Sequence, residues 1–466
     1  MNPPFNDTEG QTESRERASH EVQRLDLAAA IQASNARRAR DATVCVVGLG
    51  YVGLPLAVGF AQAGYHVVGY DVDEEKVQTL RAGVDTTGEL SDELVLDGDI
   101  AYTSDPVAIS RSEYVIISVP TPIRDDEQPN LEFVESAGRT VGEHLTPGTT
   151  VILESTVYPG TTREVLVPAL EDASGLRCGT EFSIGYSPER ATPGDDEHDL
   201  GNVVKVVSGG NDAVLEDVAQ LYESIVDAGV HRAPSIEVAE ASKVVENVQR
   251  DLNIALMNEL SMAFSRMDID THAVLEAAET KWNFHDYRPG LVGGHCIPVD
   301  PYFFAYRAKR DGFVPELVLT GREVNESMPE HVAVITLKAL NQCNKTLRES
   351  RVLILGLTYK PDVRDIRSSK AADVIEHLQE FEIDVVGHDP IADDDAMRAA
   401  FGIEIQETLS FAGFDGVVLA TPHASFDELD FGAMADDLDD RPALIDVTGA
   451  LDPESVTGAG ITYRRP

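Results

Sequence analysis

Residues 291–300, which read LVGGHCIPVD, bring a cysteine, a histidine and an aspartate within a few positions of one another. The cysteine, Cys296, could pack in a core, bind a metal or act as a nucleophile. A glycine-flanked loop is poorly suited to a core thiol. The other cysteines, Cys45, Cys178 and Cys343, form no CxxC pair or Cys/His cluster of zinc spacing, so no metal is expected. These residues alone leave a buried thiol and a nucleophile equally open.

A glycine-rich loop follows the apolar run TVCVV (43–47) and precedes a helical pattern. Its candidate cofactor-binding residues are Gly48, Gly50, Tyr51, Val52 and Gly53. The first glycine permits a tight turn, the second lets a pyrophosphate approach the backbone, and the third allows helix and strand to pack closely. Asp71 ends the next apolar run, where a carboxylate can accept both ribose hydroxyls and repel a 2′-phosphate. The pattern predicts an NAD site, and nearby Lys76 is expected to be solvated.

The elements that must position these residues recur along the chain. Apolar runs of strand type occupy 43–47, 66–70 and 114–118, and similar runs return in the same order after Arg351. The α/β fold expected is therefore two Rossmann-like, doubly wound domains, and either an internal repeat or convergence explains their likeness. Residues 237–267 contain no Gly or Pro and predict a long central helix joining them.

Four segments follow from this pattern. We expect a mobile polar tail over residues 1–40, an NAD-binding domain over 41–210, a central helical domain carrying the cysteine loop over 211–330, and a C-terminal Rossmann-like domain over 331–466. The glycine pattern is incomplete after Arg351, where one glycine stands in place of three, so a second dinucleotide site is not expected. A nucleotide of another kind could still bind there.

The charge balance excludes several classes of protein. The chain has 81 acidic and 37 basic residues, for a net charge of −44, so its field repels nucleic acid and anionic membranes. The acids are spread along the chain, which favours a halophile cytoplasm over an ordinary acidic mesophile protein. The uncharged stretch 42–66 resembles a membrane span in composition, but its five glycines and Pro55 favour a buried strand, turn and helix. We expect a cytoplasmic protein with reduced thiols.

Seven further motifs occur in a fixed order. They are VPTP (119–122), ESTVYPGTT (154–162), SPER (187–190), AEASKVVEN (239–247), GGHCIPVD (293–300), GREVNESMP (321–329) and GLTYKPDVRDIRSS (356–369). With the glycine loop, this combination resembles the UDP-glucose/GDP-mannose dehydrogenase family over about residues 43–430. The resemblance implies oxidation of the C6 alcohol of a nucleotide sugar to a carboxylate, with two NAD and no metal. It also implies that the C-terminal domain binds the UDP-sugar.

The same resemblance implies catalytic roles. Cys296 matches the nucleophile that forms first a thiohemiacetal and then a thioester. Lys243 and Asn247, one helical turn apart, match the groups that hold the C6 oxyanion. Asp300 matches a base or water-positioning residue, and Glu189 the carboxylate of thioester hydrolysis.

Binding roles are implied for a second set of residues. Thr121 and Thr156 match positions that line the nicotinamide and the reacting centre. The substrate-binding candidates, besides Lys243 and Asn247, are Arg288, Gly293, Lys360, Arg364 and Arg367. The last two resemble an arginine patch that reaches the diphosphate, in the family often from a neighbouring subunit, although one of them could instead pair with nearby acids.

The residues around the cysteine also bear on the substrate. Family members that act on UDP-glucose or GDP-mannose usually carry Pro-Lys-Asp where residues 298–300 here are Pro-Val-Asp. Together with His295 and the Tyr-Phe pair at 302–303, this resembles the branch that oxidises UDP-N-acetylhexosamines. A missing lysine would make room for an N-acetyl group. The manno epimer is favoured, because similar archaeal proteins make an acidic mannosamine for surface glycans.

Other functions remain open at this point. They are UDP-N-acetylglucosamine 6-dehydrogenase, UDP-glucose 6-dehydrogenase, a non-catalytic nucleotide-sugar-binding protein and a two-electron 3-hydroxyacid dehydrogenase. The last has no use for GGHC, and the non-catalytic protein predicts lost catalytic residues, which are present here. The long central helix implies a homodimer or a higher homo-oligomer.

Overall fold

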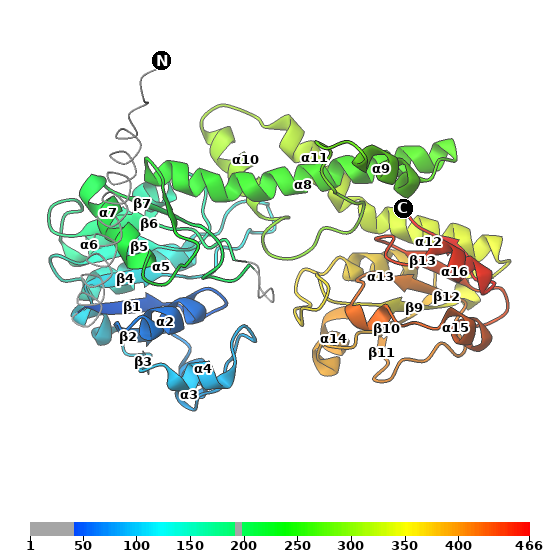
Figure 1. Cartoon of the computed structure of the whole chain (residues 1–466), viewed down its shortest axis with the longest axis horizontal. Coiled ribbons are helices and arrows are strands. Elements are labelled where there is room, and N and C mark those ends of the chain that lie inside the picture. The colour runs from blue at the N-terminus through cyan, green and yellow to red at the C-terminus, as the bar shows by residue number, and fades with distance from the viewer. Residues whose placement is uncertain (1–41, 192–197) are drawn as a thin grey trace, which may run out of the picture. The chain divides into compact units, whose positions relative to one another are not determined.

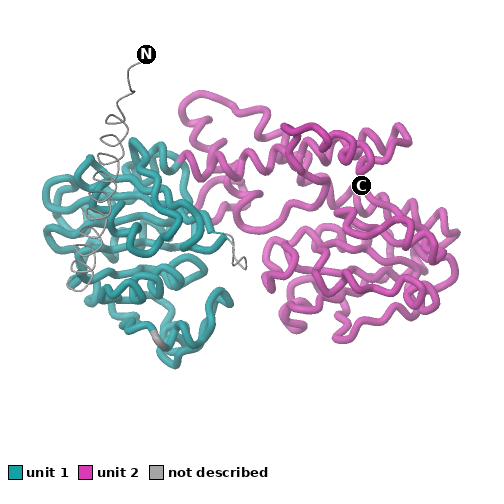
Figure 2. Tube along the Cα trace, viewed as in Figure 1, with its two compact units in different colours: residues 1–121, 131–240 teal, residues 122–130, 241–466 magenta. Residues whose placement is uncertain are grey.

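The computed structural model describes residues 42–191 and 198–466, and these form two compact units (Figure 2). Of the described residues, unit 1 comprises 42–121, 131–191 and 198–240, and unit 2 comprises 122–130 and 241–466. The polar tail predicted over residues 1–40 lies outside the described residues. The predicted domain boundary at residue 210 differs from this division, because residues 211–240 stay with unit 1, to whose sheet they add a strand.

Unit 1 is built on an eight-stranded sheet with the order β3-β2-β1-β4-β5-β6-β7-β8 (Figure 1). Neighbouring strands are parallel except for the antiparallel pair β6 and β7. The first six strands follow the Rossmann order, as predicted. The strands are β1 (Thr43–Val47), β2 (His66–Tyr70), β3 (Ile100–Thr103), β4 (Tyr114–Ile117), β5 (Thr150–Leu153), β6 (Ser183–Tyr186), β7 (Lys205–Gly209) and β8 (Val230–Arg232).

Helices connect these strands because parallel neighbours need a crossover. Strands β1, β4 and β5 are apolar and almost wholly buried, as expected for a sheet covered on both faces. The helical segments are α2 (Gly53–Gln62), α3 (Glu74–Arg81), α4 (Asp92–Asp97), η1 (Pro106–Arg111), α5 (Glu132–His144), η2 (Thr162–Leu166), α6 (Val167–Ser174) and α7 (Asp212–Tyr222). The uncharged stretch 42–66 is thus a strand, a turn and a helix, as predicted. Among the described residues, no helix is both long and apolar enough to cross a membrane.

A single long helix, α8 (Ile236–Met267), begins with the last residues of unit 1 and continues in the chain into unit 2. Its bounds agree with the prediction for residues 237–267, where neither Gly nor Pro interrupts the helix. Apolar side chains such as Val245 and Leu256 remain about half exposed on it. The homo-oligomer expected from its length stays a prediction.

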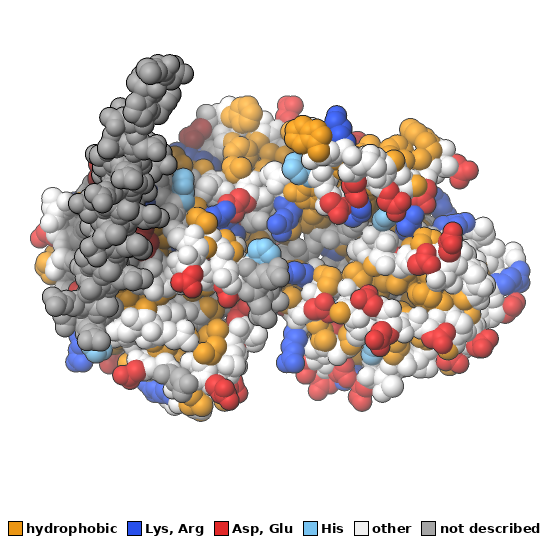
Figure 3. Space-filling model, in the orientation of Figure 1, with side chains coloured by type: hydrophobic (Ala, Val, Ile, Leu, Met, Phe, Trp, Pro, Cys, Tyr) orange, Lys and Arg blue, Asp and Glu red, His pale blue; other side chains and the backbone are white. Residues whose placement is uncertain are grey.

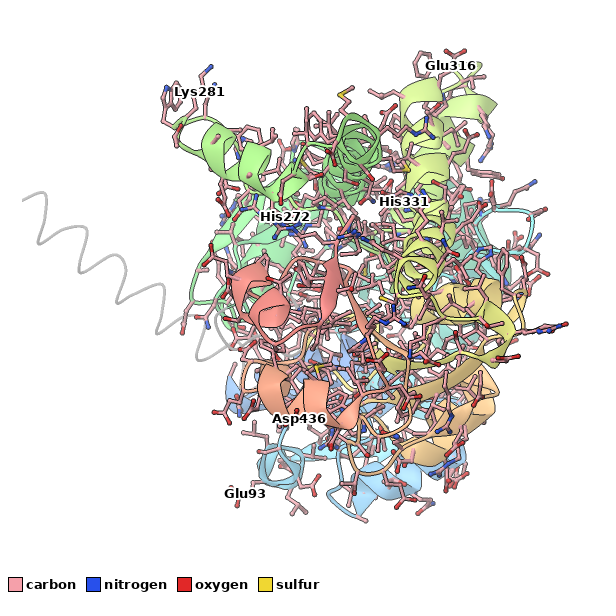
Figure 4. All side chains as sticks on the ribbon, turned by 90° about the vertical axis from the view of Figure 1, so that its right-hand side faces the viewer. Glu93, His272, Lys281, Glu316, His331 and Asp436 are labelled. Atoms are coloured by element: carbon pink, nitrogen blue, oxygen red, sulfur yellow. The ribbon has the colours of Figure 1, made fainter. Side chains whose placement is uncertain are left out.

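Unit 2 contains a helical part and a second parallel sheet with the order β11-β10-β9-β12-β13-β14. Its helices after α8 are α9 (Thr271–Glu279), α10 (Asp300–Arg310), α11 (Glu316–Glu326), α12 (Met328–Gln342), η3 (Leu347–Glu349), α13 (Ala371–Gln379), α14 (Asp394–Phe401), η4 (Ala424–Phe426), α15 (Phe431–Asp437) and α16 (Pro453–Gly458). Its strands are β9 (Arg351–Leu355), β10 (Asp384–His388), β11 (Glu404–Ile405), β12 (Gly416–Leu419), β13 (Ala443–Asp446) and β14 (Thr462–Arg464). In Figure 4, Lys281 and Glu316 extend outward from the helical part, whereas His272 lies inside unit 2, where it is buried.

The two halves share more than strand order. Gly48 and Gly356 follow the first strand of each sheet with positive φ angles of 93° and 79°. The turn after each glycine is held by the aspartate that follows the second strand: Leu49 N donates to Asp71 at 2.9 Å, and Leu357 N donates to Asp389 at 2.7 Å. The predicted likeness of the halves therefore extends to their loops, and the predicted α/β fold class is confirmed.

Acidic side chains are spread over the face of both units seen in Figure 3. They are not gathered in one patch on that face, in agreement with their even distribution along the sequence. Dispersed like charges repel one another weakly when salt screens them. A requirement for high salt stays a prediction.

Candidate active site

The loop between β1 and α2 has the shape that a pyrophosphate cradle requires. A side chain at Gly48 would place its Cβ 2.2 Å from the backbone oxygen of Ser118, and one at Gly53 would lie 1.8 Å from the oxygen of Gly48. Gly50, by contrast, has open space where its Cβ would be. The backbone there is accessible next to the start of α2, whose free N–H groups favour an anion. The loop thus fits the phosphates of a dinucleotide, and Tyr51 and Val52 complete it.

Asp71 lies at the end of β2, where the ribose of a dinucleotide would bind. Its carboxylate accepts hydrogen bonds from Leu49 N at 2.9 Å, Asp73 N at 3.0 Å and Lys76 Nζ at 2.9 Å. Burial alone would raise the pKa of Asp71, but these hydrogen bonds and the Lys76 charge lower it overall. Asp71 is therefore ionised and able to accept from ribose hydroxyls. The expectation of a solvated Lys76 is wrong, since this lysine pairs with Asp71.

Replacing Asp71 by asparagine should raise the Kd for NADH about 10-fold or more and reduce the preference for NADH over NADPH. The variant loses charge-assisted hydrogen bonds to the ribose and the repulsion of a 2′-phosphate. Fluorescence titration of the full chain with each nucleotide measures both effects. Lys76→Met is the matched control and should change the preference in the opposite direction, because it removes a cation from beside the 2′ position. An unchanged nucleotide preference in Asp71→Asn would contradict this assignment.

The two predicted threonines come together at the carboxyl ends of neighbouring strands. Thr121, after β4, donates its hydroxyl to the backbone oxygen of Thr156, after β5, at 2.7 Å. Ser155 ties the same two loops, because its hydroxyl donates to Val119 O at 2.7 Å and accepts from Val119 N at 2.9 Å. Ligands of open α/β sheets bind at this edge, so the position suits the nicotinamide-lining role predicted for both threonines.

Glu189, in the loop after β6, belongs to a buried network of charged groups. Lys205 of β7 donates to Glu189 at 2.7 Å and also to Glu154, which lies at the end of β5. Tyr222 donates its hydroxyl to the other oxygen of Glu154 at 2.5 Å. Lys205 and Glu154 are 2% and 1% exposed, so water does not screen these charges. The backbone N–H groups of Arg190 and Ala191 also donate to Glu189.

The electrostatics of this network favour an ionised Glu189. Burial opposes ionisation, but the Lys205 ammonium and the backbone donors lower the pKa of Glu189 below its ordinary value. The two carboxylates in turn raise the pKa of Lys205 against the effect of burial. Glu154 behaves in the opposite way, because burial and the nearby Glu189 charge raise its pKa although Lys205 lowers it. Lys205 therefore keeps Glu189 charged, whereas Glu154, the other partner of this lysine, ionises less readily.

In unit 2, four of the predicted catalytic residues are grouped around the start of α10. The backbone oxygen of Cys296 accepts from Asp300 N at 2.9 Å and from Val299 N at 3.1 Å, which places the cysteine in the turn that leads into that helix. Asn247, from α8, donates to the buried Asp300 carboxylate at 2.5 Å. Lys243 lies one turn earlier on α8, and its charge acts on both Cys296 and Asp300.

The thiol and the carboxyl of this group have altered ionisation. Protein atoms that surround the sulfur raise the pKa of Cys296, Lys243 and Arg250 lower it, and Asp300 raises it, with a net increase. Burial raises the pKa of Asp300 to about 6, although Lys243 and the hydrogen bond from Asn247 oppose this shift. The resting cysteine is thus a thiol next to a carboxyl group that can exchange a proton near neutral pH.

The predicted anion-binding residues are not alike. Arg288 pairs with Glu279 and with Asp286, the latter at 3.0 Å, so local acids already hold it. Arg367 donates to both oxygens of Asp365 at 2.9 and 2.7 Å, as the alternative reading of this pair of arginines allowed. Arg364 is exposed in the same loop, and Lys360 is partly buried there. Gly293 lies against this loop, since a Cβ on it would be 2.7 Å from Ser368 O.

Sequence reasoning missed the partners of Glu189 and one carboxylate in unit 1. Lys205 stands in the apolar run NVVKVVSGG. A lysine in such a run is buried only when it is paired with an acid, so its position could have indicated a buried ion pair. Glu240, on α8, accepts from Gly160 N at 2.5 Å and Thr162 N at 2.9 Å and so holds the ESTVYPGTT loop. No local pattern indicates that contact, because its partners are distant in sequence.

Comparison with known proteins agrees with this arrangement. Three models of the UDP-glucose/GDP-mannose dehydrogenase family match the chain in order: the NAD binding domain at residues 42–226, the central domain at 237–327 and the UDP binding domain at 353–453. The predicted cofactor is confirmed as NAD. Asp71 falls within the NAD binding domain, and the group around Cys296 falls within the central domain.

Individual relatives cover most of the chain. Protein CapL of Staphylococcus aureus is 45% identical over 385 residues, which cover 83% of this chain and 91% of that protein. UDP-N-acetyl-D-glucosamine 6-dehydrogenase of Pseudomonas aeruginosa is 46% identical over 389 residues, or 83% and 92%. The solved UDP-D-ManNAc dehydrogenase of Pyrococcus horikoshii matches with a TM-score of 0.82 and 31% identity over 91% of this chain and 98% of that one. The chain therefore belongs to the UDP-glucose/GDP-mannose dehydrogenase family.

Proposed function

We propose that this NAD-dependent nucleotide-sugar dehydrogenase oxidises the C6 hydroxyl of a UDP-N-acetylhexosamine to a carboxylate in two successive two-electron steps. The observation that carries the proposal is the grouping of Cys296, Lys243, Asn247 and Asp300 in unit 2. A second oxidation needs a group that captures the aldehyde, and the thiol of Cys296, on which the charges of Lys243 and Asp300 act, can do so.

The residues suit the successive steps. NAD accepts one hydride in each oxidation. The Cys296 sulfur adds to the C6 aldehyde, and Lys243 and Asn247 hold the resulting oxyanion while the carbon is oxidised to a thioester. Asp300, with its pKa raised to about 6, takes up a proton when the thiol reacts. Water then cleaves the thioester, releasing the acid and the thiol, with the ionised Glu189 as base.

The choice of sugar rests on two kinds of support. The Pro-Val-Asp sequence at 298–300 favours an N-acetylated substrate over UDP-glucose. Between the epimers, 46% identity to a protein named for the gluco substrate, against 34% to a protein named for the manno substrate, favours UDP-N-acetylglucosamine. The proposal therefore takes UDP-N-acetylglucosamine first, where similar archaeal proteins had favoured the manno epimer.

A substrate panel tests the proposal. The purified chain, in high salt, is incubated with UDP-N-acetylglucosamine, UDP-N-acetylmannosamine and UDP-glucose, and NADH is counted per sugar while the product is identified by mass. Two NADH per N-acetylated sugar, with a uronic acid product, is the expected result. Two NADH from UDP-glucose and none from the acetylated sugars would overturn the substrate class. One NADH per sugar would overturn the four-electron reaction, and no turnover with binding retained would identify a non-catalytic binding protein.

A further inference from the structure

The loop that carries Cys296 lies directly on the loop after β9, within unit 2. Gly294 N donates to Ser368 O at 3.2 Å. A Cβ on Gly293 would be 2.7 Å from Ser368 O, and one on Gly294, whose φ is +89°, would be 2.7 Å from the Tyr359 ring. Only glycines allow so close an approach, so the GG pair before the cysteine is explained by this contact.

His295 adds a side-chain contact between the same two loops. Its Nε2 lies 3.1 Å from Asp365 Oδ2, and its ring lies edge-on to Tyr359 with the centroids 5.9 Å apart. Asp365 also accepts from Arg367 through both carboxylate oxygens. Partial burial opposes ionisation, but the bonds from His295 and Arg367 hold the pKa of Asp365 well below its usual range. Asp365 is therefore a carboxylate that joins the cysteine loop to an arginine.

The contact between His295 and Asp365 is made through Nε2 of the ring. The charges that act on the Cys296 thiol are those of Lys243, Asp300 and Arg250, and His295 is not among them. The contact with Asp365 therefore gives His295 a role in holding the cysteine loop.

Residues 356–369 include the basic side chains predicted to take the substrate diphosphate and fall within the matched UDP binding domain. The Arg367 side chain is 55% exposed, so it can move from Asp365 to a diphosphate, whereas Asp365 is only 13% exposed and stays in place. Once Arg367 leaves, Asp365 keeps its bond to His295, and a carboxylate that has lost one cation binds its other donor more strongly.

We propose that His295 is a positioning residue. Through Asp365, it makes the placement of the Cys296 thiol depend on whether a nucleotide diphosphate occupies the loop after β9. This inference rests on the proposed function, because it takes Cys296 as the reacting thiol and the loop after β9 as the diphosphate site. It goes beyond that function in coupling nucleotide binding to the second oxidation.

The first test follows alkylation of Cys296 by iodoacetamide in the full chain, with the modified residue identified by mass spectrometry. In the wild type, UDP should slow alkylation about fivefold or more, because the tied loop exposes the thiol less often. In His295→Ala, alkylation should be faster without UDP, and UDP should change it less than about twofold. Protection by UDP that persists in His295→Ala would overturn the proposal, since it would come from occupancy alone.

The second test separates positioning from binding. His295→Ala should lower kcat about 10- to 100-fold and accumulate the aldehyde, while the Kd of UDP, measured by calorimetry, changes less than about threefold. His295→Gln, whose amide can still donate to Asp365, should recover most of kcat. His377→Ala, which removes a surface histidine near Glu380 on α13, is the matched control and should behave as the wild type. A large rise in the Kd of UDP, or an unchanged kcat, would overturn the positioning role.

The experiments distinguish a failure of the proposed function from a failure of the coupling through His295. If the wild type oxidises no sugar nucleotide, the proposed function is wrong, yet alkylation with and without UDP still decides whether His295 couples the loops. Thermal unfolding of each variant checks folding. If His295→Ala does not fold, the alkylation comparison is made with His295→Gln and Asp365→Asn, and the UDP effect should be kept in the first and lost in the second.

Discussion

Cys296→Ser should reduce four-electron turnover at least about 10³-fold, while the first oxidation continues more slowly and yields the aldehyde. A serine hydroxyl is a far weaker nucleophile than a thiolate, so the aldehyde is not captured and no thioester forms. Rapid-quench analysis with a carbonyl-reactive probe measures the aldehyde, and intact mass measures the covalent adduct. The size of the effect follows from the loss of a step and not from a change in affinity.

Cys178→Ser is the control for this substitution. Cys178 is a half-buried cysteine of unit 1 with no place in the proposed reaction, and its loss should leave turnover unchanged. Full turnover by Cys296→Ser, or the absence of any adduct on residue 296 in the wild type under quench conditions, would rule out the thiol mechanism. An unchanged fold is checked by the Kd for UDP, which should stay near the wild-type value.

Lys205→Met should lower the free energy of unfolding by about 3–5 kcal/mol, because it leaves two buried carboxylates without their shared cation. Lys205 is almost fully buried, so solvent does not screen the loss. Urea unfolding at fixed salt concentration measures the change. Lys338→Met, at an exposed position of α12, is the matched control and should change stability by less than about 0.5 kcal/mol.

The loss caused by Lys205→Met should also depend on pH. Without the lysine, the folded-state pKa of Glu154, which is already raised in the wild type, rises further, and that of Glu189 rises above its unfolded value. A carboxyl group whose folded-state pKa is raised destabilises the fold increasingly as the pH rises from its unfolded-state pKa to its folded-state pKa. The loss should therefore be larger at pH 8 than at pH 5. Adding Glu154→Gln to Lys205→Met should recover part of the stability at pH 8. A loss below about 1 kcal/mol at every pH would show that the network does not stabilise the fold.

Much of the fold could be predicted because its signals are local. Short apolar runs mark the strands, the run from Glu237 to Met267 has no helix breaker, and Gly48 follows its strand where only a positive φ closes the turn. The order of the runs then restricts the sheets, because parallel strands need crossovers and these are right-handed. The boundary near residue 210 could not be located in this way, since β8, which lies beyond that residue, joins the sheet of unit 1 by pairing with β7.

In the candidate site, too, local features could be predicted and contacts between distant residues could not. Lys243 and Asn247 share a helix face by spacing alone, and the resemblance to a family supplied their partners Cys296 and Asp300. Their roles stay predictions, although the structure places them together. The network of Glu189 was missed because Lys205 and Glu154 are 51 residues apart in the sequence and meet only across the sheet.

What the sequence determined by itself is the set of elements and the loops whose conformation depends on neighbouring residues, such as the glycine cradle and the first turn of α10. Only the tertiary structure decided which charges pair between distant segments: Lys205 with Glu154, and His295 with Asp365. The physical reason is that periodicity and turn chemistry act over a few residues, whereas the choice of an ion-pair partner depends on burial and distance, which exist only after distant segments have packed.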